Sequence, residues 1–131
     1  MTTPGPVSED ITVIQGATYK MRITWNDDQA TPQPIPLTGW RAHMQIRSKR
    51  GGAGVLMANL ASDVTGTDGS MTLEPEGLIG VIDVKVSALT TAGFKKGGFY
   101  DVFVIKTDDP TEAYRLVYGA MNISQSASVN T

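Results

Sequence analysis

A chain of 131 residues with a formal net charge of −2 is enough for one domain and lacks the basic excess that nucleic-acid-binding domains carry. Because it contains no cysteine, disulfide bonds, thiolate nucleophiles and cysteine-ligated zinc are excluded, and no apolar run reaches the roughly 18 residues of a membrane helix. Valine, isoleucine and threonine together fill 35 positions, and 14 glycines and seven prolines supply turns, so the composition predicts one mainly β domain.

The predicted elements are short strands separated by turns. Residues 1–10 are interpreted as an irregular arm, because two prolines and a glycine interrupt any regular structure there. Strict alternation of apolar and polar residues over 19–25 and 37–47 predicts two strands with one buried and one wet face. Shorter apolar segments predict four more strands, at residues 11–14, 55–60, 71–73 and 78–86.

The rest of the chain predicts one helical turn and a final pair of strands. Residues 88–93 form the only helical candidate, with Ser87 as its N-cap and Gly93 at its end. Strands follow at residues 98–106 and 113–123, joined by a turn at 107–111. The core is expected to contain Met21, Ile23, Trp25, Trp40, Met44, Ile46, Ile82, Val84, Val86, Tyr100 and Val102.

The final two strands are apolar on both faces. Tyr100, Val102 and Val104 share one face of the first strand, yet apolar residues also occupy its other face. Strands of this kind are either central and covered on both sides or covered by another protein. We expect a partner interface at Phe99, Phe103, Ile105, Val117, Met121 and Ile123, the alternative being that loops or the short helix cover these residues.

Sites of chemistry are hard to find in the sequence. The single histidine, His43, lies on the polar face of a predicted strand, where a solvated or hydrogen-bonded side chain is expected rather than a general base. The acidic pairs at 27–28 and 108–109 do not have the ligand spacing of a calcium loop, and Glu74 and Glu76 flank a turn proline and are expected to lie in water. No catalytic residue, metal or cofactor is therefore expected.

Several segments resemble the small β-sandwich modules of tailed-phage virions, found at the N-terminus of upper-baseplate proteins and as stand-alone proteins of actinobacteriophages. The similarity covers about residues 11–123, and one departure is the turn at 107–112, where the family usually has a glycine. The resemblance implies an assembly role and transfers no catalytic residue. It is carried by Ile14-Gln-Gly-Ala-Thr-Tyr19, Pro36-Leu-Thr-Gly-Trp-Arg-Ala-His-Met-Gln-Ile-Arg47, Gly80-Val-Ile-Asp-Val-Lys-Val86, Leu89-Thr90, Gly98-Phe-Tyr-Asp-Val-Phe-Val104 and Tyr114-Arg-Leu-Val-Tyr-Gly119.

Together these observations predict an all-β protein, an antiparallel two-sheet β-sandwich of about seven to nine strands with one short helix. The sandwich is expected to span residues 11–123 and to be followed by a polar tail at 124–131. The expected function is structural and not enzymatic: a multi-copy virion subunit of the tail tip or baseplate, assembled in the host cytoplasm with other virion proteins. The alternatives are a head decoration or head–tail connector protein, and a carbohydrate-binding module. A module of that kind should expose aromatic residues, whereas Trp25 and Trp40 fall in phase with the core.

Overall fold

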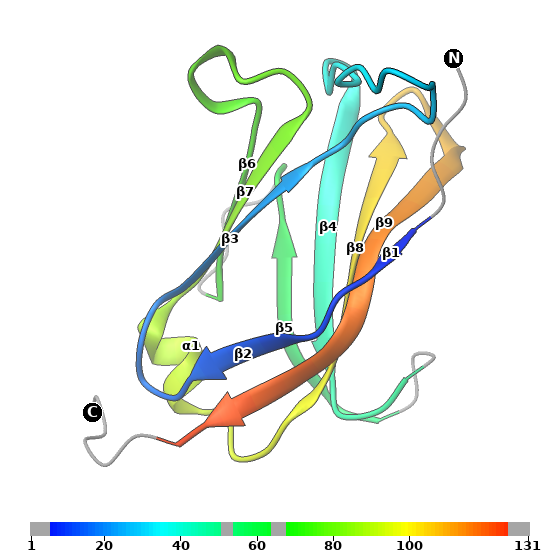
Figure 1. The fold of residues 1–131 in the computed structure, drawn as a ribbon. Coiled ribbons are helices and arrows are strands. Elements are labelled where there is room, and N and C mark those ends of the chain that lie inside the picture. Colours follow the sequence, from blue (N-terminus) through cyan, green and yellow to red (C-terminus); the bar gives the residue numbers. More distant parts are fainter. Residues whose placement is uncertain (1–5, 51–53, 64–67, 126–131) are drawn as a thin grey trace.

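The computed structural model describes residues 6–50, 54–63 and 68–125, which form two β-sheets packed as a sandwich (Figure 1). The larger sheet has the order β1-β9-β8-β4-β5, with β2 also paired to β9, and the smaller sheet has the order β3-β7-β6. The larger sheet contains β1 (Val7–Ser8), β2 (Ile11–Ile14), β4 (Trp40–Arg47), β5 (Leu56–Ala61), β8 (Gly98–Lys106) and β9 (Asp109–Ser124). The smaller contains β3 (Tyr19–Thr24), β6 (Gly69–Leu73) and β7 (Val81–Val86). The predicted β-sandwich is confirmed.

The core lies between the sheets and follows the predicted alternation. Along β4, Ala42, Met44 and Ile46 are fully buried while the residues between them point outward. Eight of the eleven predicted core residues are buried. The other three, Met21, Ile23 and Trp40, are half-buried and pack against the core from its margin.

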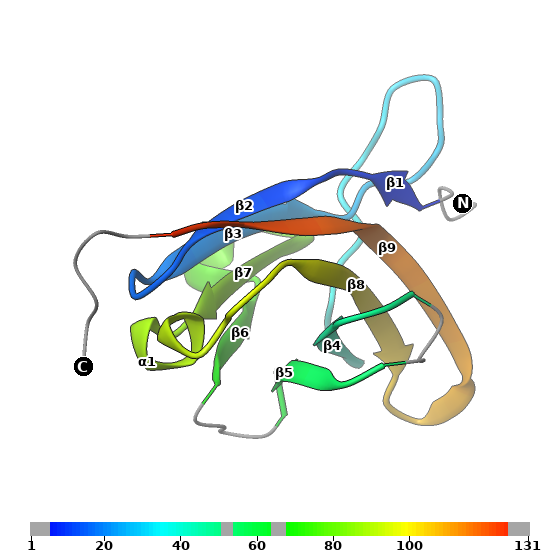
Figure 2. The same cartoon turned by 90° about the horizontal axis from the view of Figure 1, so that it is seen from below.

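The N-terminal segment is more ordered than predicted. Val7 and Ser8 were expected in an irregular arm, but they form β1 and pair in parallel with β9, and β2 does the same further along. Figure 2 shows β2 lying beside β9 at the margin of the larger sheet. All other strand pairs are antiparallel, as predicted. The parallel pairs join the N-terminal strands β1 and β2 to β9, the last strand, which runs in the same direction.

The short helix is as expected, and a glycine with a left-handed backbone precedes β4. Helix α1 (Ala88–Ala92) begins after Ser87, whose hydroxyl accepts a hydrogen bond from the backbone N–H of Thr90 at 3.2 Å, and ends at Gly93. Gly39 has φ +84°, a left-handed conformation that an L-residue rarely adopts, directly before Trp40 turns toward the core.

Two turns differ from the prediction. Strand β9 begins at Asp109, so only Thr107 and Asp108 separate it from β8. A 3₁₀ turn, η1 (Pro75–Gly77), follows β6, and Glu74 before it is half-buried rather than in water. Its carboxylate accepts hydrogen bonds from the backbone N–H groups of Leu37 and Gly80, which explains its burial.

Four stretches of the chain lie outside the described residues. These are residues 1–5 of the predicted arm, residues 51–53 between β4 and β5, residues 64–67 between β5 and β6, and residues 126–131 of the predicted tail. In the part of the chain that the structure describes, no helix has the length and apolar character that crossing a membrane requires.

Candidate interaction surface

The outward side of β4, β8 and β9, here called the outer face, gathers the side chains that the core excludes. The strand register aligns them in rows across the sheet. Phe103 lies between His43 and Arg115, and Asp101 lies between Gln45 and Tyr118. Aromatic residues of β8 therefore lie beside cationic residues of β4 and β9, and the outer face combines aromatic rings with cations.

The structure divides the six residues predicted to form an interface. Phe99, Phe103 and Ile105 lie on the outer face and are half-buried. Val117 and Met121, exposed by only 4% and 1%, belong to the core instead. Ile123 is half-buried and packs against the same core. The prediction that these three residues share an exposed face with the phenylalanines is wrong.

A β-bulge explains the difference. Val102 pairs with Val117, but the next residue of β8, Phe103, pairs with Arg115, so Leu116 is an extra residue in β9. Leu116 and Val117 are both buried, which interrupts the alternation. The outer-face neighbours of the phenylalanines are therefore Ala120 for Phe99 and Arg115 for Phe103, and the face is more cationic than the sequence pattern indicates.

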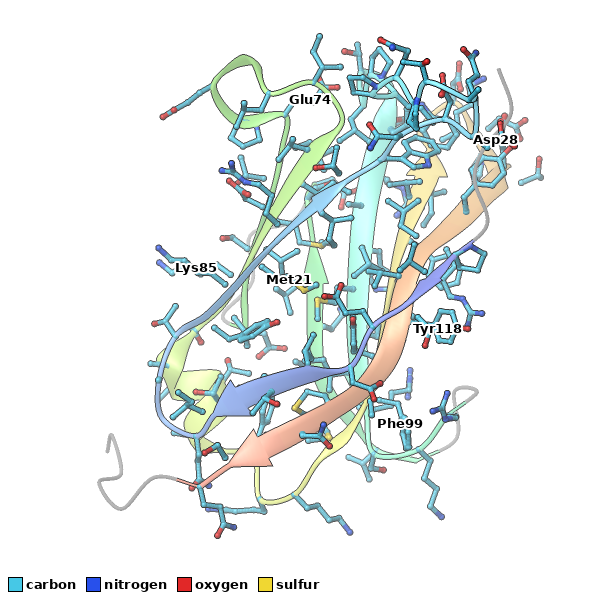
Figure 3. All side chains as sticks on the ribbon, in the orientation of Figure 1. Met21, Asp28, Glu74, Lys85, Phe99 and Tyr118 are labelled. Atoms are coloured by element: carbon cyan, nitrogen blue, oxygen red, sulfur yellow. The ribbon has the colours of Figure 1, made fainter. Side chains whose placement is uncertain are left out.

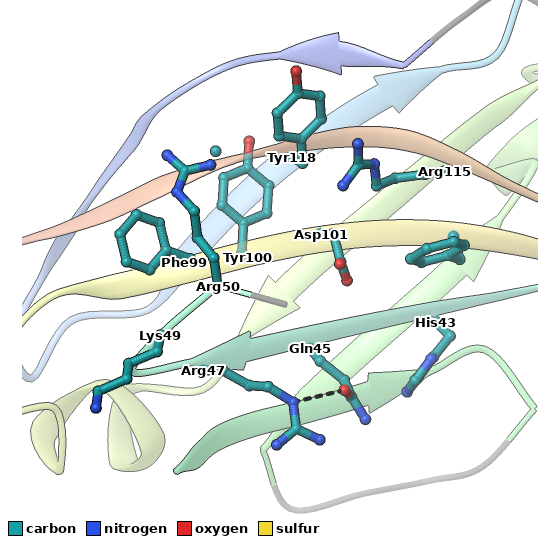
Figure 4. A pocket seen from close by; sticks show the side chains of 12 residues that line it. His43, Gln45, Arg47, Lys49, Arg50, Phe99, Tyr100, Asp101, Arg115 and Tyr118 are labelled. Carbon is teal, nitrogen blue, oxygen red and sulfur yellow. Dashed lines mark hydrogen bonds between the residues drawn. The ribbon is translucent and has the colours of Figure 1, made fainter. Parts of the chain in front are cut away.

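A groove of about 360 Å³ crosses the outer face (Figure 4). Two of its cations lie on aromatic rings: the Arg50 guanidinium is 4.4 Å from the centroid of Phe99, and that of Arg115 is 4.1 Å from the centroid of Tyr118. A guanidinium stacked in this way keeps its N–H groups free at its edge, where they match a carboxylate. The other groove-lining residues include His43, Gln45, Arg47, Lys49, Asp101 and Phe103.

Asp101 is the one carboxylate that lines the described groove. Partial burial raises the pKa of Asp101, and the nearby charges of Arg115, His43 and Arg47 oppose that rise. Arg47 donates a hydrogen bond from Nε to Oε1 of Gln45 at 3.2 Å. With one carboxylate among several cations, the groove favours an anionic ligand group.

The candidate chemical residues have structural partners. His43 Nε2 lies 2.7 Å from Oδ1 of Asn59, which makes it a hydrogen-bonded strand histidine as predicted. Asp27 is buried, and its carboxylate accepts hydrogen bonds from the backbone N–H groups of Gln29 and Gln33. Within the described ranges, no group of three or more His, Asp or Glu side chains is arranged to hold a metal ion.

Sequence reasoning missed the cations of the groove. The alternation over residues 37–47 places His43 and Arg47 on the wet face of their strand, but it does not indicate which strand lies beside them. Arg115 and Tyr118 could have been found only from the register of β9, which the bulge changes. The strand period of two, counted from Tyr100 and Val102 in the core, was sufficient to place Phe99 and Phe103 on the outward side of β8.

Comparison with known families covers almost the whole of the sandwich. Residues 5–124 match the family described as LtfC-like, β-sandwich domain. A search of curated proteins gives no match to this chain. LtfC is a phage tail protein. The match therefore agrees with the resemblance to β-sandwich modules of tailed phages that the sequence shows. The chain belongs to the LtfC-like family of β-sandwich domains.

Proposed function

We propose that this protein is a structural, non-enzymatic subunit of a phage tail, in the tail-tip or baseplate region, and that its outer face docks onto other virion proteins. The observation that carries this is the groove, in which half-buried aromatic rings carry stacked arginines. Arginine and aromatic residues are enriched at the energetic centres of protein interfaces. The LtfC-like domain supports a tail location.

The groove fits a protein partner better than a neutral glycan. Sugar rings bind to open aromatic faces, but Arg50 covers one face of Phe99 and Arg115 covers one face of Tyr118. Trp25 is buried in the core at 2% exposure and cannot serve as a platform. The head decoration and connector roles lack a comparable family link, because the matched family is named for a tail protein.

Complementation of a phage that lacks this gene tests the proposal. Phe103→Asp adds a charge at the centre of the outer face and is expected to lower incorporation into purified particles about 10-fold or more, as loss of a central aromatic contact does. Mass spectrometry of the particles measures incorporation, and circular dichroism of the isolated variant should show a folded domain.

Leu89→Asp is the matched control. Leu89 is 78% exposed on α1, away from the groove, so this variant should assemble normally. Immunogold labelling of wild-type particles should mark the tail end. Absence of the wild-type protein from particles, or labelling of the head, would overturn the proposed function. Equal incorporation of both variants would show that the outer face is not the docking surface.

A further inference from the structure

Loops of opposite charge lie toward the two ends of the sandwich. One end, here called the acidic end, carries the loop from β3 to β4, η1 and the β8–β9 turn. Glu74 accepts the backbone N–H of Leu37, and Thr107 donates to the Gly39 carbonyl from its N–H at 2.9 Å and its hydroxyl at 2.6 Å, so these three segments are bound together. With Glu74, which precedes η1, and the first residues of β9, they contain Asp27, Asp28, Glu74, Glu76, Asp108, Asp109 and Glu112.

The opposite end is basic. Arg47 ends β4 and residues 48–50 follow it, and residues 95–96 precede β8. The two segments meet because Arg47 pairs with Phe99 at the start of β8. They contain five cations, Arg47, Lys49, Arg50, Lys95 and Lys96, and no carboxylate. In Figure 3, Asp28 and Glu74 are labelled at one end of the sandwich and Phe99 near the other. The groove of the outer face lies toward this basic end.

The β8–β9 turn is an exposed acidic tip of defined shape. Asp108 and Asp109 are exposed, and the Asp109 carboxylate accepts hydrogen bonds from the N–H and the hydroxyl of Thr111 at 3.2 and 2.5 Å. These bonds lower the pKa of Asp109 and keep its carboxylate ionised. Glu112 lies 3.6 Å from Lys106 and is compensated by it, so Asp108 and Asp109 are the charges that the tip presents.

We propose that a second copy of this chain docks its acidic tip, Asp108 and Asp109, into the groove of the outer face, against Arg50 and Arg115. The complementarity is contained within one chain: the groove offers stacked guanidiniums with free N–H edges, and the tip offers two carboxylates. The contact joins different surfaces of the two copies, and repeated contacts of that type close into a ring or extend as a fibre.

This inference deepens the proposed function and rests on it, because a tail subunit would be present in several copies side by side. A second copy is favoured over an unrelated acidic protein because both halves of the contact are present on every molecule, the tip at the β8–β9 turn and the groove on the outer face. The contact is tested on the isolated chain, so its failure is distinguishable from absence of the protein from particles.

Self-association measured by sedimentation velocity is the first test. At about 20 mM NaCl the wild-type chain should form oligomers whose association constant falls about 10-fold or more at 500 mM NaCl, because salt shortens the range over which exposed charges attract. A wild-type chain that stays monomeric at low salt and about 1 mM protein overturns the proposal, as does association that salt leaves unchanged.

A charge exchange is the second and sharper test. The tip variant combines Asp108→Lys with Asp109→Asn, in which asparagine can keep the bonds to Thr111. The groove variant combines Arg50→Glu with Arg115→Glu. Each variant alone should lose association about 10-fold or more. An equal mixture should regain it, because the wild-type tip of the groove variant then meets the wild-type groove of the tip variant, and the altered tip and altered groove also carry opposite charges.

Matched controls separate this contact from a general charge effect. Lys20→Glu with Lys85→Glu makes the same change in charge as the groove variant, at a pair of exposed residues facing out from the smaller sheet. Glu76→Lys adds a cation elsewhere at the acidic end. Both should associate like the wild type, with all variants folded by circular dichroism. A mixture that stays monomeric, or controls that lose association as fully as the groove variant, would overturn the proposal.

Discussion

Trp25 joins the core to an aromatic cluster at the start of β4. Its ring meets Trp40 edge-on with centroids 5.0 Å apart and lies 6.1 Å from Tyr114. Trp25 is buried whereas Trp40 is half-buried, so Trp25→Ala should lower the free energy of unfolding by about 3–5 kcal/mol and Trp40→Ala by less. Urea denaturation measures both. A larger loss for Trp40→Ala would contradict the packing order of the two rings.

The partly buried carboxyl of Asp101 should make the free energy of unfolding depend on pH. Because burial raises its pKa above the ordinary 3.8, the folded chain binds the proton more tightly than the unfolded chain. The contribution of Asp101 to stability therefore falls as the pH rises from the unfolded to the folded pKa, and the ionised form is unfavourable at neutral pH. Asp101→Asn should raise the urea midpoint at pH 7 and lose that advantage below pH 3.8.

Asp108→Asn provides the control for this comparison. Asp108 is exposed at the β8–β9 turn, so its replacement should change stability by no more than about 0.5 kcal/mol at either pH. Equal gains from Asp101→Asn at pH 7 and pH 3 would show that the ionised carboxylate is not the cause.

At the scale of the elements, the contact between β9 and the N-terminal segment depends on Gly119. A Cβ built at Gly119 would lie 2.2 Å from the Glu9 carbonyl oxygen, which also accepts the Tyr100 hydroxyl at 2.6 Å. Gly119→Ala should therefore displace β1 and cost about 1–3 kcal/mol. Thermal melts measure the cost, and hydrogen exchange should increase at the Glu9 amide, which donates to the Tyr118 carbonyl.

Gly93→Ala is the matched glycine substitution. Its Cβ would lie 3.4 Å from the Thr90 carbonyl oxygen, close to an ordinary contact, and its φ of −80° suits alanine. It should melt within a few degrees of the wild type. A Gly119→Ala variant that behaves the same way would show that the segment moves aside without cost.

Most of the strands were predictable, because a strand that buries one face alternates in sequence. What could not be predicted is how they pair. Nothing in the alternation of β9 marks Leu116 as an extra residue, since both phases of that strand are apolar. The polar surroundings of Val7 and Ser8 gave no strand signal, because their pairing depends on the distant β9. The groove was missed for the same reason: its rows exist only once the register is known.

At the scale of the whole molecule, the sandwich is closed by its two terminal regions. Strand β2 pairs with the end of β9, from Ile11 opposite Met121 to Ile14 opposite Ser124. Ile11 and Val13 point into the core and are 6% and 0% exposed. The described N-terminal strands β1 and β2 are therefore both part of the larger sheet, although sequence patterning places only β2 inside the domain.

Two truncations measure how much of this segment the fold requires. Removing residues 1–8 deletes β1, whose two residues are exposed, and should leave a folded domain with slightly lower stability. Removing residues 1–14 also deletes β2 with two core side chains. Loss of a buried aliphatic side chain costs about 2–5 kcal/mol. Two such losses are comparable with the whole free energy of unfolding of a domain, which is about 5–15 kcal/mol. Far-ultraviolet circular dichroism should show the longer truncation unfolded at 25 °C, and a cooperative melt near the wild-type temperature would mean that the sandwich closes without β2.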